Sequence, residues 1–136
     1  MATTEEEAIS KVLASARTIA VIGLSAKPHR ASFGVTETLQ SSGYRIFPVN
    51  PNEDEVLGEK CYARPEDIPD KIDIVDIFRR PEFVPEIVDA AIRIGARAIW
   101  MQEGVEDEKS AERARAAGLF VIMDNCIAKE IYKRRK

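Results

Sequence analysis

Five segments of the chain combine residue types that could bind a charged small molecule, and each directly follows a short apolar run. Gly, Pro, Asn, Ser, Arg and Gln are concentrated in segments 23–32, 49–53, 78–82, 101–105 and 124–127. Glycine permits tight turns and close approach of the backbone, while arginine and amide side chains donate hydrogen bonds. This recurring combination is the main sign of function in the sequence.

The first segment, GLSAKPHRAS, has residues suited to a phosphate group. Gly23 allows a tight turn, Leu24 follows it, Ser25 offers a hydroxyl, and Lys27 and Arg30 bring positive charge. A helix beginning after this arginine would also present free N–H groups to an anion. The segment is not a G-x-G-x-x-G fingerprint, because serine and proline stand at the second and third glycine positions. An ordinary strand-to-helix loop, with Ser32 as the helix cap, is the alternative interpretation.

The second and third segments are suited to contacts with a nucleotide. Val49, Asn50 and Pro51 end an apolar run where an NAD-binding protein carries an acidic residue for the ribose hydroxyl. The missing carboxylate counts against NAD and leaves room for a nucleotide along the backbone. In the third segment, Phe78 could stack on a base and Arg79 could pair with a phosphate.

The fourth and fifth segments give weaker indications. Gln102 and Gly104 directly follow an apolar run whose Trp100 is expected in the core. Cys126 begins a predicted helix, where the pKa of a thiol can fall, but nothing in the sequence brings His29, the one histidine, to it. Helix capping by Asp124 or Asn125 is the expected role of this segment.

Alternating strands and helices must position these segments. Short apolar, β-branched runs predict strands, and amphipathic stretches between them predict helices. The predicted strands are 18–24, 45–50, 72–78, 96–102 and 119–124, and the predicted helices are about 4–15, 32–42, 82–94, 106–117 and 126–134.

This alternation predicts an α/β fold of Rossmann-like type, a three-layer αβα domain with a five-stranded, mainly parallel sheet and helices on both faces. We expect the strand order 3-2-1-4-5, with ligands binding beyond the carboxyl ends of the strands, between the first and fourth. A length of 136 residues predicts a single domain over 1–136.

Composition argues against several classes of protein. A net charge of −3 counts against general nucleic-acid binding, and no apolar run approaches the ~20 residues of a membrane span. The N-terminus, MATTEEEAIS, is unlike a signal peptide, so a cytoplasmic location is expected. Two cysteines and one histidine cannot supply the four ligands of a structural zinc site.

Taken together, the segments resemble one known family. The stretches that carry the resemblance are IAVIGLS, GYRIFPVNP, IDIVDIFRRPE, IGARAIWMQEGV and VIMDNC, in order and at compatible spacings from about residue 9 to 130. They are similar to the small stand-alone CoA-binding proteins related to the CoA-binding domain of the succinyl-CoA synthetase α subunit.

The resemblance implies binding of coenzyme A or acyl-CoA through its nucleotide-pyrophosphate end, at the carboxyl edge of the sheet and without catalysis. The first segment would take the pyrophosphate, the second and third the adenosine, and the fourth the pantetheine arm. By position, the implied binding residues are Gly23, Leu24, Ser25, Lys27, Arg30, Ser32, Val49, Asn50, Pro51, Phe78, Arg79, Gln102 and Gly104.

The chain departs from the family pattern at Asn125, where family members usually carry an arginine, so affinity or partner choice could differ here. The catalytic and nucleotide-activating domains of the synthetase have no counterpart, and no ligase chemistry is expected. Two alternatives stay open: an NAD(P)-dependent oxidoreductase, and a regulatory partner of a CoA enzyme with a vestigial pocket. A homodimer or a protein partner is compatible with either binding role.

Overall fold

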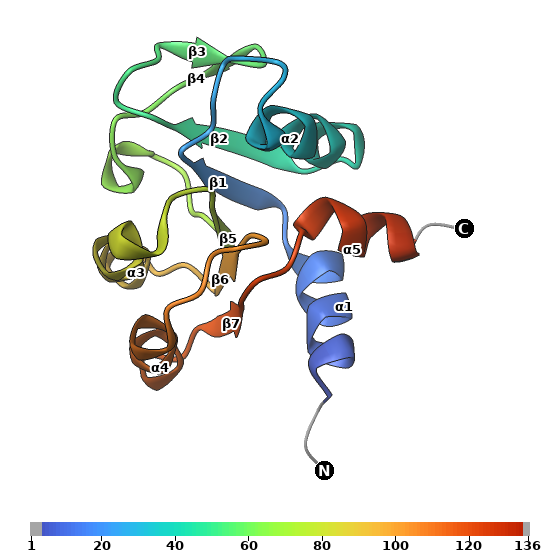
Figure 1. The fold of residues 1–136 in the computed structure, drawn as a ribbon, viewed down its shortest axis with the longest axis vertical. Helices are drawn as coiled ribbons and strands as arrows, with labels where there is room; N and C mark the ends of the chain where they lie inside the picture. The colour runs from blue at the N-terminus through green and yellow to red at the C-terminus, as the bar shows by residue number, and fades with distance from the viewer. Residues whose placement is uncertain (1–3, 135–136) are drawn as a thin grey trace.

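The structure, a computed structural model, describes residues 4–134 and is built around a five-stranded parallel sheet (Figure 1). The strands lie in the order β2-β1-β5-β6-β7, and every neighbouring pair is parallel. Their bounds are β1 Thr18–Ile22, β2 Arg45–Val49, β5 Ile74–Ile77, β6 Ala98–Met101 and β7 Phe120–Ile122. All the predicted strands are present, and each is shorter than its apolar run because the run continues into a loop.

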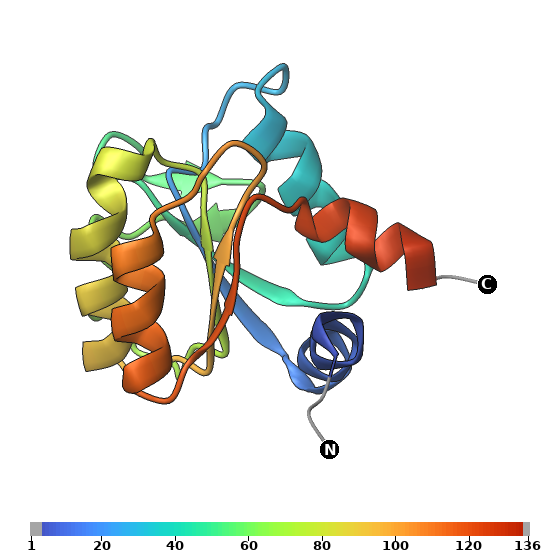
Figure 2. The same cartoon turned by 60° about the horizontal axis from the view of Figure 1, so that its bottom comes forward.

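Helices cover both faces of this sheet (Figure 2). One face carries α3 (Val84–Arg93) and α4 (Glu108–Ala116). The other carries α1 (Glu5–Ser15), α2 (Ala31–Ser41) and α5 (Ile127–Arg134). The predicted three-layer αβα fold is therefore confirmed. None of the helices within residues 4–134 has the length and hydrophobicity needed to span a membrane.

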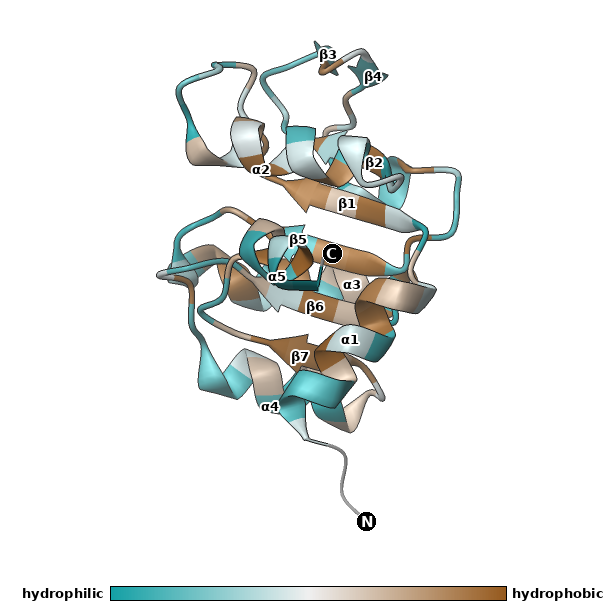
Figure 3. Cartoon of the chain, turned by 90° about the vertical axis from the view of Figure 1, so that its right-hand side faces the viewer, coloured by the Kyte–Doolittle hydropathy of each residue, from teal (hydrophilic) through white to brown (hydrophobic). Residues whose placement is uncertain are grey.

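Each face of the sheet has its own apolar core, because successive strand residues point to opposite faces. On β5, Val75 and Ile77 pack with α3 and α4, whereas Ile74 packs with the helices of the other face. Trp100 and Met101 of β6 are both fully buried, as expected of core residues. The strands accordingly form a hydrophobic band through the molecule (Figure 3).

One carboxyl group is buried in this core. Asp76 of β5 pairs in register with Val21 and Trp100, and neither of its carboxyl oxygens has a hydrogen-bond partner within residues 4–134. Burial raises the pKa of Asp76 well above its ordinary value. The folded chain therefore holds this proton more tightly than the unfolded chain does.

The predicted strand order, 3-2-1-4-5, is wrong. Numbered along the chain, the strands lie in the order 2-1-3-4-5, because β5 pairs with β1. Asp73, just before β5, adds a side-chain link to this pairing: its carboxylate accepts the N–H groups of Arg17 (2.8 Å) and Thr18 (3.3 Å) at the start of β1. The strand order consequently reverses between β1 and β5, not between the first and fourth strands.

The connection from β2 to β5 contains elements that the sequence did not predict. They are the antiparallel pair β3 (Glu55–Val56) and β4 (Glu59–Lys60) and the short 3₁₀ helix η1 (Pro65–Asp67). The connection returns to the edge of the sheet at Tyr62, whose N–H donates to the Pro48 carbonyl (2.9 Å). Pro48 is tolerated because β2 is an edge strand.

Candidate functional site

A cleft of about 730 Å³ opens at the carboxyl ends of β1, β2 and β5. It lies at the reversal of strand order, where open parallel sheets bind their ligands. The loops after the three strands converge on it from distant parts of the sequence. The lining residues are Gly23, Ser25, Arg30, Ala31, Ser32, Asn50, Pro51, Asn52, Phe78, Arg79, Arg80 and Phe83.

Gly23 connects the three loops at the end of β1. Its N–H donates to the Val49 carbonyl (2.8 Å), and the carbonyl of the preceding residue, Ile22, accepts the N–H of Phe78 (2.9 Å). Gly23 has a φ of +84°, and a Cβ there would lie 2.8 Å from both the Phe78 carbonyl oxygen and Arg79 Cδ. Only glycine fits this left-handed, crowded position.

Two serines shape the loop between β1 and α2. Ser32 Oγ accepts the N–H of Ser25 (3.1 Å), and Ser25 Oγ accepts the N–H of Lys27 (3.1 Å). The alternative interpretation of this segment, with Ser32 as the cap of α2, is therefore wrong in that detail: Arg30 is the N-cap residue, and its side chain makes no capping hydrogen bond. Because Ala31 and Ser32 line the cleft, the first turn of α2 keeps N–H groups available to an anion.

Asn50 ties the loop after β2 to the loop after β1. Its Nδ2 donates to the Leu24 carbonyl (3.0 Å), and its Oδ1 accepts the N–H of Asn52 (2.9 Å). Its backbone carbonyl accepts a hydrogen bond from the Sγ of Cys61 (3.4 Å), a buried thiol whose pKa is raised by that burial. Since both carboxamide atoms already have partners in the protein, Asn50 acts as a clamp between two loops.

Two arginines flank one aromatic ring on the β5 side of the cleft. Phe83 ends the short 3₁₀ helix η2 (Pro81–Phe83). The guanidinium carbon of Arg79 lies 4.1 Å from the centre of the Phe83 ring, and that of Arg80 lies 5.9 Å from it. These contacts hold both cations at the cleft by cation–π attraction.

The charge of the cleft is opposite to that of the protein. Of the described residues, three arginines and no acidic side chain line it, although the net charge of the chain is −3. Within residues 4–134, Arg30 and Arg79 form no ion pair, and Arg80 has only a loose one, 3.9 Å from Nε to Glu82 Oε1. Such a cleft can bind an anion with several phosphate groups. It holds no pair of groups suited to general acid–base catalysis.

Comparison with known families connects this cleft to a ligand class. The model of the CoA binding domain family matches residues 17–132, a range that includes every residue lining the cleft. The chain belongs to the CoA-binding domain family. The resemblance seen in the sequence motifs is thereby confirmed.

Relatives of this CoA-binding domain include both short and long proteins. Uncharacterized protein YneT of Bacillus subtilis (strain 168) is 40% identical over 119 residues, which are 88% of each chain. The ADP-forming acetate–CoA ligase II of Archaeoglobus fulgidus is 36% identical over 104 residues, 73% of this chain but only 16% of the ligase. A solved structure, a hypothetical protein from Pyrococcus horikoshii OT3, has a TM-score of 0.92 at 37% identity and 98% coverage of both chains.

Most residues predicted to bind the ligand of this CoA-binding domain come together in the cleft. Those that line it are Gly23, Ser25, Arg30, Ser32, Asn50, Pro51, Phe78 and Arg79. Leu24 is fully buried behind the loop, and Lys27 is exposed beside it. Val49 lines an adjoining cavity of about 310 Å³, which shares Gly23, Pro51 and Arg79 with the cleft.

Gln102 and Gly104 are not among the lining residues, and both make contacts within the protein. Gln102 Oε1 accepts the N–H of Ile127, the first residue of α5 (3.2 Å). The N–H of Gly104 donates to Asp124 Oδ1 (2.7 Å). The expected capping of α5 by Asp124 or Asn125 is thus wrong, because Gln102 supplies the acceptor. Contact of Gln102 and Gly104 with a pantetheine arm stays a prediction.

Sequence reasoning missed four of the lining residues: Ala31, Asn52, Arg80 and Phe83. Arg80 and Asn52 lie within the polar segments that follow β5 and β2, so the signal was present. Phe83 lies just beyond the third segment and looks like an ordinary core residue of the following helix. No cluster of three or more His, Cys, Asp or Glu side chains within residues 4–134 is placed to hold a metal ion.

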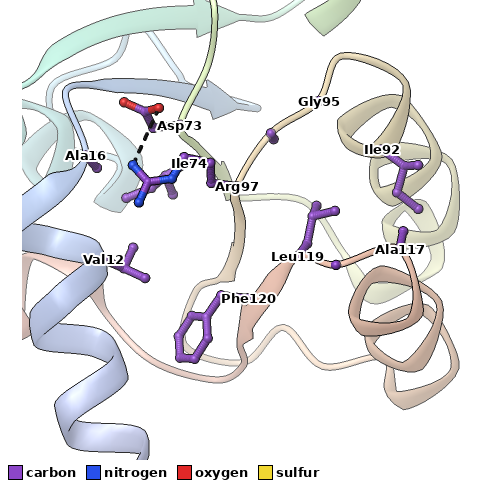
Figure 4. Close-up of a pocket in the computed structure, with 12 residues that line it drawn as sticks. Val12, Ala16, Asp73, Ile74, Ile92, Gly95, Arg97, Ala117, Leu119 and Phe120 are labelled. Carbon is purple, nitrogen blue, oxygen red and sulfur yellow. Dashed lines mark ion pairs between the residues drawn. The ribbon is translucent and has the colours of Figure 1, made fainter. Parts of the chain in front are cut away.

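A separate cavity of about 440 Å³ lies at the opposite edge of the sheet (Figure 4). Asp73 and Arg97 are the charged side chains among its described lining residues, and Arg97 Nη1 lies 3.9 Å from Asp73 Oδ1. Asp73 also accepts the N–H groups at the start of β1, and Arg97 Nη2 donates to Ser15 Oγ (2.9 Å). These side chains hold the fold together, so the cleft at the carboxyl edge is the better candidate for ligand binding.

Proposed function

We propose that the protein binds CoA or acyl-CoA through the nucleotide-pyrophosphate end, at the carboxyl-edge cleft, and catalyses no reaction itself. The observation that carries the proposal is the positive charge of the cleft. Among the described residues, three arginines and no carboxylate line it, in a chain of net charge −3. CoA carries a pyrophosphate and a 3′-phosphate, and charge-assisted hydrogen bonds are the strong ones in proteins. Membership of the CoA-binding domain family supports the same ligand.

The residues of the cleft fit a pyrophosphate. Gly23 has no room for a side chain, so the backbone of the first turn can approach a ligand closely. The first turn of α2 offers N–H groups with no side-chain cap, and Arg30 stands at its N-cap position. We place the pyrophosphate here, with Ser25 as an additional hydroxyl partner.

The adjoining cavity fits the adenosine part of the ligand. Ile22, Val49 and Ile87 give it apolar side chains on one part of its wall, and it shares Pro51 and Arg79 with the cleft. The remaining lining includes the charged residues Arg64, Glu66, Glu86 and Arg93. The flat face of an adenine ring could lie against the apolar side chains, with its ring nitrogens and amino group toward the polar ones, while the phosphates remain in the cleft. We therefore place the ribose and adenine near Val49 and Pro51.

The proposal of a non-catalytic role rests on the residue types present. Within residues 4–134, no His, Cys, Asp or Glu lines the cleft, and these are the usual acids, bases and nucleophiles. The single histidine, His29, is exposed on the loop before α2 and has no hydrogen bond or ion pair with another described residue. Binding without turnover is the function that this set of side chains supports.

Isothermal titration calorimetry with CoA and NADH tests the proposal. We expect CoA to bind and NADH to bind at least tenfold more weakly, because Asn50 replaces the usual acidic partner of the ribose and is fully engaged as a clamp. Arg30→Ala should weaken CoA binding about tenfold or more. The matched control is Arg115→Ala on α4, whose side chain pairs with Glu108 far from the cleft.

The outcomes separate the candidate functions. No binding of CoA at millimolar ligand would reject the proposal and favour a regulatory partner with a vestigial pocket. Tighter binding of NADH than of CoA would favour an oxidoreductase. Equal effects of the Arg30 and Arg115 variants would show that the ligand binds elsewhere.

A further inference from the structure

The cavity around Asp73 and Arg97, here called the amino-edge cavity, has two charged side chains that the fold uses only in part. Asp73 Oδ2 accepts the N–H groups of Arg17 (2.8 Å) and Thr18 (3.3 Å). Arg97 Nη2 donates to Ser15 Oγ (2.9 Å). The remaining atoms, Asp73 Oδ1 and Arg97 Nη1, lie 3.9 Å apart, which is too long for a hydrogen bond. Within residues 4–134, each side chain therefore keeps one charged atom available to a ligand.

Three helices end at the amino-edge cavity. Ala16 is the C-cap residue of α1, Ala117 is that of α4, and Gly95 directly follows the C-cap of α3. The carbonyl end of a helix carries a partial negative charge, equivalent to about half an elementary charge. Together with Asp73 Oδ1, these helix ends favour a positively charged group in the cavity, while Arg97 Nη1 favours a negatively charged group beside it.

Most of the remaining lining is apolar. Val12 of α1, Ile92 of α3 and Phe120 of β7 pack against the core but are only partly buried. Figure 4 shows the guanidinium of Arg97 pointing toward Asp73 and the end of α1. A volume of about 440 Å³ lies within the range of roughly 300–1,000 Å³ that is usual for small-molecule sites. The cavity can therefore cover an apolar side chain next to its two charged groups.

A zwitterion with an apolar side chain matches these features together. A free α-amino acid carries an ammonium and a carboxylate on one carbon. The ammonium can donate to Asp73 Oδ1, and the carboxylate can accept from Arg97 Nη1. The charges of the ligand sum to zero, as do those of Asp73 and Arg97, so binding leaves no charge without a partner. An amine or an acid alone would satisfy only one of the two groups.

We propose that the amino-edge cavity is a second binding site, which takes a free α-amino acid with an apolar side chain. The inference goes beyond the proposed function and is independent of it. The cavity and the cleft lie at opposite edges of the sheet and have no lining residue in common.

Isothermal titration calorimetry of the whole protein with leucine and phenylalanine tests the inference. We expect at least one of them to bind at millimolar concentration. For that amino acid, the amine lacking the carboxylate and the acid lacking the ammonium should each bind about tenfold or more weakly. For leucine these analogues are 3-methylbutylamine and 4-methylpentanoate. Glycine should also bind about tenfold or more weakly, because it has no side chain to bury.

Arg97→Gln should weaken amino-acid binding about tenfold or more and leave CoA binding unchanged. The matched control is Arg45→Gln, which removes the same charge from the same edge of the sheet, where Arg45 pairs with Asp70 outside the cavity. The side chain of Arg97 is 48% exposed, so its substitution should not prevent folding. Circular dichroism and thermal melting verify this.

The outcomes separate the two binding claims. No binding of leucine or phenylalanine at millimolar concentration would overturn the inference and leave the proposed function intact. Equal affinity for the amino acid and for its amine or acid analogue would also overturn it, because the two charged groups would then not be read together. Amino-acid binding that survives Arg97→Gln would place the ligand elsewhere and overturn it as well. Failure of CoA alone to bind would reject only the proposed function.

Discussion

The backbone of Gly23 lies against the side chain of Arg79, so that a Cβ on Gly23 would come within 2.8 Å of Arg79 Cδ. The two residues follow neighbouring strands, β1 and β5, which pair at the point where the strand order reverses. A glycine in one loop thus makes room for a cation from another. Arg79 can occupy this position in the cleft because residue 23 has no side chain.

Gly23→Ala should damage both the fold and the cleft. We expect a loss of about 1–3 kcal/mol in the free energy of unfolding, measured by urea denaturation, together with weaker CoA binding. Gly43→Ala is the matched control, because Gly43 also has a positive φ (+94°) but nothing within 4 Å of its Cβ position. A binding defect of equal size in both variants would show that the contact with Arg79 is unimportant.

Asn50→Asp should release the clamp between the first two loops. The carboxylate can still accept the N–H of Asn52 but cannot donate to the Leu24 carbonyl, so we expect a loss of about 1–3 kcal/mol in stability. Asn52→Asp adds the same charge to the cleft without breaking the clamp. Both variants should bind CoA more weakly, and only the first should lower the urea midpoint. Equal midpoints would argue against the clamp.

Asp76→Asn should change how stability depends on pH. Burial raises the pKa of Asp76 in the folded state, so the folded chain holds this proton more tightly than the unfolded chain. The associated stability is fully present below the unfolded pKa, about 3.9, and is lost as the pH rises through the folded pKa. An asparagine cannot ionise, so the wild-type protein should lose stability relative to the variant over this range.

Urea denaturation at several pH values from 4.5 to 9 measures that difference, whose slope is at most about 1.4 kcal/mol per pH unit. Asp89→Asn removes an exposed carboxylate paired with Arg113 and should not reproduce the trend. Parallel pH profiles for the wild-type protein and Asp76→Asn would contradict the prediction.

Affinity for CoA should fall as the salt concentration rises. The Debye length shortens from about 10 Å at 0.1 M to about 3 Å at 1 M, which screens the attraction between phosphates and the exposed Arg30 and Arg80. Titrations at several NaCl concentrations measure the slope, and pantetheine, which lacks the nucleotide, should not show it. A salt-independent affinity would mean that contacts with apolar walls dominate binding.

The local pattern of apolar and polar residues predicted the strands, the helices and the edge of the sheet that holds the cleft. It did not predict which strands pair with each other. Apolar runs mark β1 and β5 as buried strands wherever they lie in a sheet, so periodicity cannot choose between the orders. Asp73 supports the observed order by accepting the N–H groups of Arg17 and Thr18, two residues that lie 56 and 55 positions away in the sequence. A long-range contact of this kind has no local signature.

The candidate site was predictable to the extent that it lies at strand ends. Gly23, Asn50 and Arg79 converge because parallel strands end at one edge, whichever order they take. The roles of Gln102 and Phe83 were not predictable, because they depend on three-dimensional neighbours: the N–H of Ile127 and the guanidinium of Arg79. Polar residue types indicate the right edge of the sheet, and contacts decide which of them face a ligand.

The rate at which a thiol reagent labels Cys61 should report how often the binding loops open. Cys61 is 8% exposed and its Sγ lies 3.4 Å from the Asn50 carbonyl oxygen, so opening of this loop should speed its reaction with a thiol reagent. A bound nucleotide that bridges the loops should slow the labelling of Cys61 in proportion to occupancy. Cys126, which is equally buried and lies between β7 and α5, supplies the internal reference.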